Sequence, residues 1–169
     1  MQRRVIVLVG PKGAGKSTIG ALIERELGVA FVRVEPIFLR VREAIGADHP
    51  ELERRGFQAV REALVEALRS HEAICFESTG ASRETAPMLE ELSRHAHMLP
   101  VQVTARPEQY LPRVRSRDLS IHIPVSDDRV EEINARAAEV ELAWAARIDN
   151  SGAFDPEAIL AKVRDLLEA

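Results

Sequence analysis

The chain has 169 residues, which is about the length of one ordinary domain. Its hydrophobic fraction of 46% is sufficient for a buried core and excludes a disordered or collagen-like chain. The 23 basic and 27 acidic residues give a formal net charge of −4, too balanced for a protein that binds nucleic acid through its overall charge. The single cysteine excludes a disulfide scaffold and a multi-cysteine metal site.

The hydropathy pattern gives no sign of a membrane segment. No apolar run approaches the roughly 18 residues of a membrane span. The basic start at Arg3 and Arg4 is followed by the apolar run 5–9, which is shorter than the ~7–15 residues of a signal-peptide core. We therefore expect a cytoplasmic monomer or homodimer with neither a membrane nor a nucleic-acid partner.

Short β-branched runs alternate with longer helical patterns along the chain, which is typical of a parallel sheet with crossover helices. Strands are expected at residues 5–9, 30–34, 73–76, 98–104 and 146–150. Helices are expected at 17–27, from Pro36 onward, and at 50–69, 84–96, 107–117, 127–144 and 156–167. We therefore predict one α/β domain over residues 1–169, a five-stranded parallel sheet with helices on both faces.

The segment after the first strand carries the most specific motif. Residues 10–17 read Gly-Pro-Lys-Gly-Ala-Gly-Lys-Ser and match the P-loop pattern at every fixed position, between an apolar strand and an amphipathic helix. The glycines let backbone N–H groups converge on phosphate oxygens, and the next helix adds its positive end. Lys16 is expected to reach the β- and γ-phosphates and Ser17 to bind Mg²⁺.

The motif predicts a three-layer P-loop NTPase fold that binds a nucleotide. The residues expected to hold its phosphates are Gly10, Gly13, Ala14, Gly15, Lys16, Ser17 and Thr18. A GTPase usually has an Asn-Lys-x-Asp motif, which this chain lacks, and the strand before Glu77 is unlike the long apolar run that ends in Asp in motor ATPases. The chain length instead fits a single kinase domain.

With the P-loop and several single residues at similar spacing, the chain resembles the shikimate kinase branch of the nucleoside-monophosphate-kinase-like enzymes over nearly its whole length. That family transfers the γ-phosphoryl group of ATP to a hydroxyl of a small acceptor. The resemblance implies ATP and Mg²⁺ as cofactors, a small-molecule acceptor, and a mobile lid at about residues 113–126 that closes over the phosphates.

Two carboxylates at strand ends are candidates for the reaction centre. The family's Leu-Gly-x-x-Phe-x-Asp-x-Asp corresponds to residues 27–35, in which Glu35 replaces the second Asp and Arg33 the first. The resemblance implies that Glu35 contacts the acceptor hydroxyl, which it could orient or deprotonate. Arg33 reverses a charge that supports the Mg²⁺ shell in the family, and Glu77 is the candidate that would compensate by holding a Mg²⁺-bound water.

The remaining candidates are carried over from the family by position. Residues 56–61 correspond to the acceptor motif Gly-Glu-x-x-Phe-Arg and keep its Gly and its Arg, which is Arg61, but not its Glu and Phe. Gly80 and Arg136 also correspond to acceptor positions. In the lid, Arg113 corresponds to the arginine that stacks on adenine, and Arg117 to the arginine that closes over the phosphates. Asp149 and Asn150 resemble the end of the fifth strand near the base in related kinases.

Each candidate also has a purely structural interpretation. Arg61, Arg117 and Arg136 could be solvated charges on helices, Glu35 a first-turn carboxylate that favours the helix dipole, and Glu77 the partner of a nearby arginine. The hypothesis favoured is an ATP-dependent kinase of a small anionic metabolite other than shikimate, with a hydroxyl or a phosphate as the acceptor group, because the acceptor motifs are altered. The alternatives are a nucleotide-binding regulatory module or slow ATPase and, ranked last, an ATPase that works on a partner macromolecule.

Overall fold

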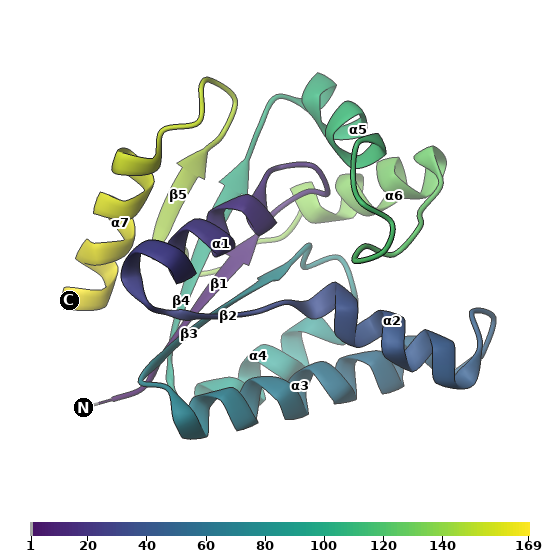
Figure 1. Cartoon of the computed structure of the whole chain (residues 1–169), viewed down its shortest axis with the longest axis horizontal. Helices are drawn as coiled ribbons and strands as arrows, with labels where there is room; N and C mark the ends of the chain where they lie inside the picture. The colour runs from purple at the N-terminus through teal and green to yellow at the C-terminus, as the bar shows by residue number, and fades with distance from the viewer. Residues whose placement is uncertain (1) are drawn as a thin grey trace.

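The computed structural model describes residues 2–169 and shows the predicted α/β architecture (Figure 1). Five parallel strands form one sheet in the order β2-β3-β1-β4-β5. The strands are β1 (Arg4–Val9), β2 (Ala30–Val32), β3 (Ala73–Ser78), β4 (His97–Thr104) and β5 (Ala146–Asp149). The helices are α1 (Lys16–Leu27), α2 (Val34–Ile45), α3 (Leu52–Ser70), α4 (Thr85–Ser93), α5 (Pro107–Arg115), α6 (Asp127–Ala138) and α7 (Pro156–Glu168).

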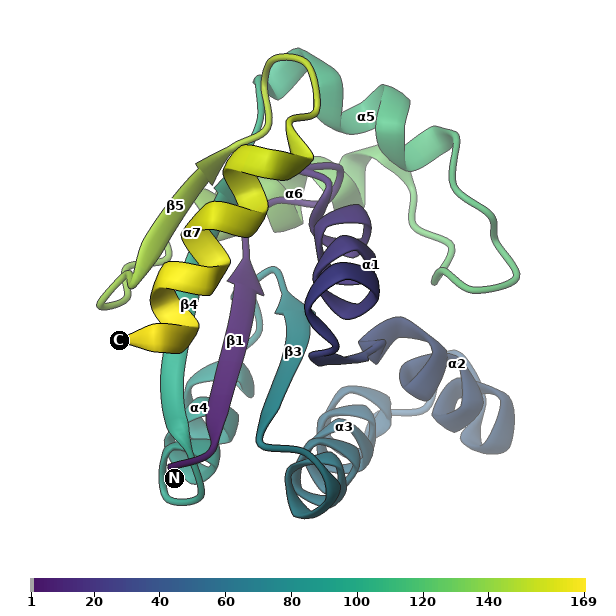
Figure 2. The ribbon, with the colours of Figure 1, turned by 60° about the vertical axis from the view of Figure 1, so that its left-hand side comes forward.

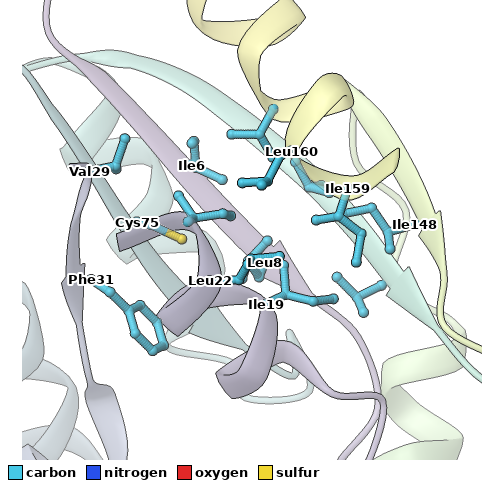
Figure 3. Close-up of a cluster of buried hydrophobic side chains, with 14 of the residues drawn as sticks. Ile6, Leu8, Ile19, Leu22, Val29, Phe31, Cys75, Ile148, Ile159 and Leu160 are labelled. Atoms are coloured by element: carbon cyan, nitrogen blue, oxygen red, sulfur yellow. The ribbon is translucent and has the colours of Figure 1, made fainter. Parts of the chain in front are cut away.

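The central strand β1 is buried on both faces, which explains its unbroken apolar run. Ile6 and Leu8 face the helices α1 and α7, where they pack against side chains such as Ile19 and Leu160 (Figure 3). Val5, Val7 and Val9 instead belong to the apolar cluster that involves α3 and α4. The helices thus form a layer on each side of the sheet (Figure 2), the three-layer arrangement that the sequence predicts.

Several predicted boundaries are wrong: α4 ends at Ser93 and not near residue 96, α5 ends at Arg115 and not at residue 117, and two further errors have a clear physical reason. The helix expected to end near residue 144 ends at Ala138, because Val140, Leu142 and Trp144 alternate with other residues at a period of two and pack together on the α3–α4 side. A helix would place Leu142 on the face opposite Val140 and Trp144, so the three side chains could not pack on one side. The strand expected at residues 30–34 ends at Val32, since Val34 already begins α2.

The segment predicted as a lid lies at the carboxyl edge of the sheet. Residues 116–126 are irregular and connect α5 to α6, and both views show this connection as a long loop that faces α2 (Figures 1 and 2). Ligands of open α/β sheets bind outside the carboxyl ends of the strands. The P-loop and the residues after β3 meet at this edge, where the Gly10 N–H donates to the Ser78 carbonyl at 3.1 Å.

None of the helices within residues 2–169 combines the length and the apolar character that crossing a bilayer needs.

The burial pattern predicts that truncating a buried side chain lowers the free energy of unfolding strongly, whereas truncating an exposed one does not. Leu64 in α3 is fully buried beneath the sheet, so Leu64→Ala is expected to lower the free energy of unfolding by about 2–5 kcal/mol. The same substitution at Leu119, which is 65% exposed, is the matched control and is expected to change it by less than about 0.5 kcal/mol. Urea denaturation measures both, and equal effects would contradict the described packing.

Candidate active site

The P-loop curls because two of its glycines adopt a left-handed backbone conformation. Gly13 has a φ of +86° and Gly15 a φ of +96°, which side-chain-bearing residues rarely adopt. A Cβ atom on Gly13 would lie 2.4 Å from the Tyr110 carbonyl oxygen, and one on Gly15 would lie 2.3 Å from Nδ2 of Asn150. The loop therefore needs glycine for both its conformation and its close neighbours.

Lys16 is buried at the centre of this loop, with only 5% of its surface exposed. Its ammonium group donates to the carbonyls of Gly10 at 2.8 Å and Pro11 at 2.7 Å. Burial lowers the pKa of Lys16 to about 8, although the negative charge of Glu77 opposes this shift. The loop thus holds a desolvated cation beside the backbone amides that the sequence predicts for a phosphate site.

The Ser17 hydroxyl and the Glu77 carboxylate meet beside the P-loop. The Ser17 hydroxyl lies 2.9 Å from each oxygen of the Glu77 carboxylate and donates to it. Strand pairing sets this contact, because Glu77 of β3 lies opposite Leu8 of β1, just before the P-loop. Hard oxygen donors suit Mg²⁺, which usually takes one or two protein ligands and completes its shell with phosphates and waters. The partner of Glu77 is therefore a P-loop hydroxyl and not an arginine, and the pair fits the metal that the sequence predicts.

Arg33 does not place its charge at this pair. Its guanidinium lies 2.9 Å from the carboxylate of Glu24 and 4.8 Å from the centre of the Phe31 ring. Half of the Arg33 side chain is exposed. The charge reversal noted in the sequence is thus neutralised by an ion pair with a carboxylate of α1.

A side-chain amide from α6 braces the P-loop on one side. The backbone N–H of Lys12 donates to Oδ1 of Asn134 at 2.7 Å, and Nδ2 of Asn134 donates to the Lys12 carbonyl at 3.1 Å. This two-bond pairing imitates a strand ladder and fixes the peptide at the third position of the motif. The sequence analysis did not identify Asn134, because the two residues are 122 positions apart and no local pattern links them.

Arg113 and Asn150 brace the loop from the other side. Arg113 donates to the carbonyls of Gly13 at 3.2 Å and Asn150 at 3.1 Å, and Nδ2 of Asn150 donates to the Ala14 carbonyl at 3.0 Å. The carboxylate of Asp149 is exposed and accepts from the Ser151 N–H at 3.0 Å, so it bonds within its own turn and not to the P-loop. Of the predicted pair at the end of β5, only Asn150 therefore reaches the P-loop.

A groove of about 530 Å³ runs from the P-loop toward the end of β5. Its walls include three groups of residues: Gly13, Gly15, Lys16, Ser17 and Thr18 of the P-loop and α1, Arg113 and Arg117 of the lid region, and Asn150 and Phe154 after β5. The remaining predicted phosphate residues lie behind this wall, because Ala14 is fully buried and Gly10 packs against the Val103 carbonyl. Phe154, which the sequence analysis did not identify, is a large apolar side chain with 39% of its surface exposed.

A second cavity, of about 220 Å³, lies between α2, α3 and α6. Glu35, Glu77 and Arg136 line it, which brings three of the predicted residues together. Two residues, Lys16 and Arg117, line both this cavity and the groove. The two spaces therefore meet at a pair of cations.

Glu35 is the most heavily contacted side chain of the second cavity. Its carboxylate lies 3.6 Å from Nζ of Lys12, 3.6 Å from Arg117 and 3.3 Å from Nδ1 of His122, and it accepts from the Ile123 N–H at 2.8 Å. Burial disfavours ionisation, but these four groups together outweigh burial and hold the pKa of Glu35 below its usual range. Glu35 thus belongs to the first turn of α2 and also ties the lid to the P-loop.

The other two predicted acceptor residues do not line the cavity. Arg61 of α3 lies 3.0 Å from the carboxylate of Glu91 in α4, and it lines a groove on the outer side of these helices. Gly80 turns the loop after β3 with a φ of +74°, while its neighbours Thr79 and Ala81 line the cavity. Gly80 thus shapes the loop that lines the second cavity, whereas Arg61 points to the outer side of α3 and α4.

The comparisons with known proteins agree with this geometry. A protein-family model described as an AAA domain matches residues 5–140. A shikimate kinase from Geobacter sulfurreducens is 34% identical over 155 residues, which cover 88% of this chain and 83% of that protein. The chain belongs to the shikimate kinase-like P-loop kinases. A member of this group uses a nucleotide to transfer a phosphoryl group to a small metabolite.

Solved structures show the same P-loop kinase fold. The shikimate kinase of Bacteroides thetaiotaomicron superimposes with a TM-score of 0.62 at 19% identity, with all of both chains covered. A sugar kinase from Janibacter sp. HTCC2649 gives a TM-score of 0.68 at 14% identity, covering 99% of this chain and 95% of that one. The five-stranded parallel sheet with helices on both faces is therefore confirmed as a P-loop kinase fold.

The pKa of Lys16 predicts proton uptake when ATP binds. The free chain loses the Lys16 proton as the pH rises through about 8, and the phosphates of a bound nucleotide raise that pKa again. Binding at about pH 9 should therefore take up nearly one proton, and binding at about pH 7 close to none. Calorimetry in buffers of different ionisation enthalpy measures the uptake. Lys16→Arg keeps its charge and should abolish the pH dependence, and uptake that persists in this variant would refute the assignment.

The Asn134 brace predicts an effect on nucleotide affinity without direct contact. Asn134→Ala removes both bonds to the Lys12 peptide, each with a net contribution of about 0.5–1.5 kcal/mol, and should raise the KM for ATP by roughly tenfold. Glu131→Ala, at an exposed position of the same helix, is the matched control and should leave the KM unchanged. Equal KM values in the two variants would show that the brace does not position the loop.

Proposed function

We propose that this chain transfers the γ-phosphoryl group of ATP to a hydroxyl of a small anionic metabolite, with Mg²⁺ held by Ser17 and Glu77. The observation that carries the proposal is the shared wall formed by Lys16 and Arg117. A polyphosphate in the groove would place its terminal phosphate at this wall, directly beside a molecule in the second cavity. Donor and acceptor would therefore meet where the positive charge is concentrated.

Phosphoryl transfer depends mainly on positioning and on stabilising the charge that develops on phosphate oxygens. Lys16 and the P-loop amides supply this stabilisation on one side of the γ-phosphate, and Arg117 supplies it from the lid. When bound, Mg²⁺ would add charge neutralisation between the β- and γ-phosphates. Ser17 would be its direct ligand, and Glu77 would orient a water of its shell.

Glu35 is better suited to orient the acceptor hydroxyl than to deprotonate it early. A general base works best when its pKa lies near the working pH, and the surrounding cations hold the pKa of Glu35 below its usual range. The transition state of phosphoryl transfer is loose, so the hydroxyl needs little loss of its proton before the P–O bond forms. Glu35 accepts a hydrogen bond first and the proton late.

The lid and the far end of the groove complete the nucleotide site. Arg117, His122 and Ile123 all reach Glu35, so the segment over the second cavity can exclude water from the reaction. Arg113 and Phe154 line the groove beyond the phosphates, and the exposed ring of Phe154 offers a stacking face for the base. These residues bind and orient the nucleotide, while the second cavity selects the acceptor.

A turnover assay tests this proposal. ADP release is followed with ATP, Mg²⁺ and a panel of small hydroxy acids, with and without a chelator. Lys16→Ala should abolish turnover, while Glu35→Gln should lower kcat by roughly 10²–10⁴-fold with less change in the KM for ATP. Arg40→Gln, an exposed position of the same helix as Glu35, is the control. ATP binding that is equally tight in chelator, together with no transfer to any acceptor, would favour a regulatory module instead.

A further inference from the structure

Apart from Glu35 of α2 and Glu53 of α3, the side chains of α2, α3 and α4 that line the second cavity are apolar. These apolar side chains are Val34 and Phe38 of α2, Phe57 and Val60 of α3, and Met88 of α4. The rings of Phe38 and Phe57 pack edge to face, with their centres 5.4 Å apart and an angle of 86° between them. Aromatic pairs of this geometry are stabilising, so both rings have defined positions.

A glycine within α3 sets the position of this wall. A Cβ atom on Gly56 would lie 2.1 Å from the ring of Phe38, so the ring rests directly on the α3 backbone. Glycine inside a helix costs about 1 kcal/mol relative to alanine. This cost is offset where the missing side chain lets the Phe38 ring approach the α3 backbone closely.

The opposite wall, on α6, is cationic. Arg129, Ile133 and Arg136 are spaced i, i+4 and i+7 and therefore share the face of α6 that lines the cavity. Glu132 holds the two arginines side by side, with its oxygens 2.5 Å from Arg129 and 2.8 Å from Arg136. Both arginines are about half exposed, so a carboxylate or phosphate of the acceptor can reach their remaining donors.

The three hydroxyl side chains that line the cavity, Ser78, Thr79 and Ser82, each make a local hydrogen bond. Ser78 and Thr79 accept from backbone N–H groups of the loop after β3, and Ser82 donates to Glu53. A sugar-like body would place several hydroxyls against the apolar wall, and a buried hydroxyl without a partner costs about 1–3 kcal/mol. An apolar body gains about 25 cal/mol for each Å² of apolar surface removed from water.

We propose that the acceptor is an amphipathic hydroxy acid: a compact apolar ring or branched chain that carries an anionic group and one reactive hydroxyl. The apolar body lies on Phe38, Phe57 and Met88, the anion on Arg129 and Arg136, and the hydroxyl points to Glu35. This inference rests on the proposed function. The cavity of about 220 Å³ is below the ~300–1,000 Å³ typical of drug-sized ligands, so the acceptor is small.

The reaction that follows is balanced without any further reactant. The acceptor oxygen forms a bond to the γ-phosphorus, and the bond from this phosphorus to the bridging oxygen breaks. The electron pair of that bond leaves on ADP. The hydroxyl proton passes to Glu35 and then to solvent when the lid opens.

Competing acceptors test the proposal. The amphipathic set is 3-hydroxycyclohexanecarboxylate and 3-(hydroxymethyl)benzoate, and the polyhydroxy set is shikimate and gluconate. The amphipathic set is expected to show a kcat/KM that is about 10–100-fold higher, the discrimination that an apolar pocket gives against added hydroxyls. A higher or equal kcat/KM for the polyhydroxy set overturns this inference but leaves the proposed kinase function intact. Transfer to neither set, in a chain that binds ATP, overturns both.

Two variants test the walls separately. Phe57→Ala should lower kcat/KM for the amphipathic set by about tenfold, while Phe57→Leu, which keeps an apolar contact and the fold, should restore most of it. Arg136→Gln should raise the KM for 3-(hydroxymethyl)benzoate but not for 3-(hydroxymethyl)benzamide, which has no charge. Arg94→Gln, which removes the same i,i+4 pairing on α4, is the control and should change neither KM. Equal effects on acid and amide would overturn the role of α6.

Discussion

A buried ammonium group between two cavities is the constraint on which the rest of the site depends. Lys16 is held by carbonyls of its own loop, so the loop has to curl around it. That curl requires left-handed glycines, whose neighbours approach too closely for any other residue. Asn134 and Asn150 then hold the loop from opposite sides, so α6 and the end of β5 are both attached to the structure that surrounds the cation.

The fold could be predicted because its determinants are local and repetitive. The unbroken apolar run of β1 and the helical spacing that follows it are visible without any tertiary information. The errors occurred where a short segment carried two compatible patterns. Residues 139–144 were expected to continue α6, but the apolar side chains of this stretch alternate, and contact with the core decided in favour of an extended segment.

The nucleotide side of the site could be predicted further than the acceptor side. The P-loop is one contiguous stretch of sequence, so its motif alone predicts a phosphate site. The second cavity is assembled from helices far apart in the chain, and the orientation of each side chain depends on its partners. Arg61 illustrates this, because its position on α3 matched the family but Glu91 of α4 holds it on the outer side. No local sequence signal indicated that Phe154 lines the groove or that Asn134 pairs with the Lys12 peptide.

The single tryptophan of this chain lies in the extended segment that follows α6. Trp144 packs against the apolar cluster on the α3–α4 side and lines neither the groove nor the second cavity. Its intrinsic fluorescence therefore reports on the integrity of that layer and is insensitive to direct contact with a nucleotide. Denaturation curves followed by this signal can be compared between the free and the ligand-bound protein without correction for quenching by the base.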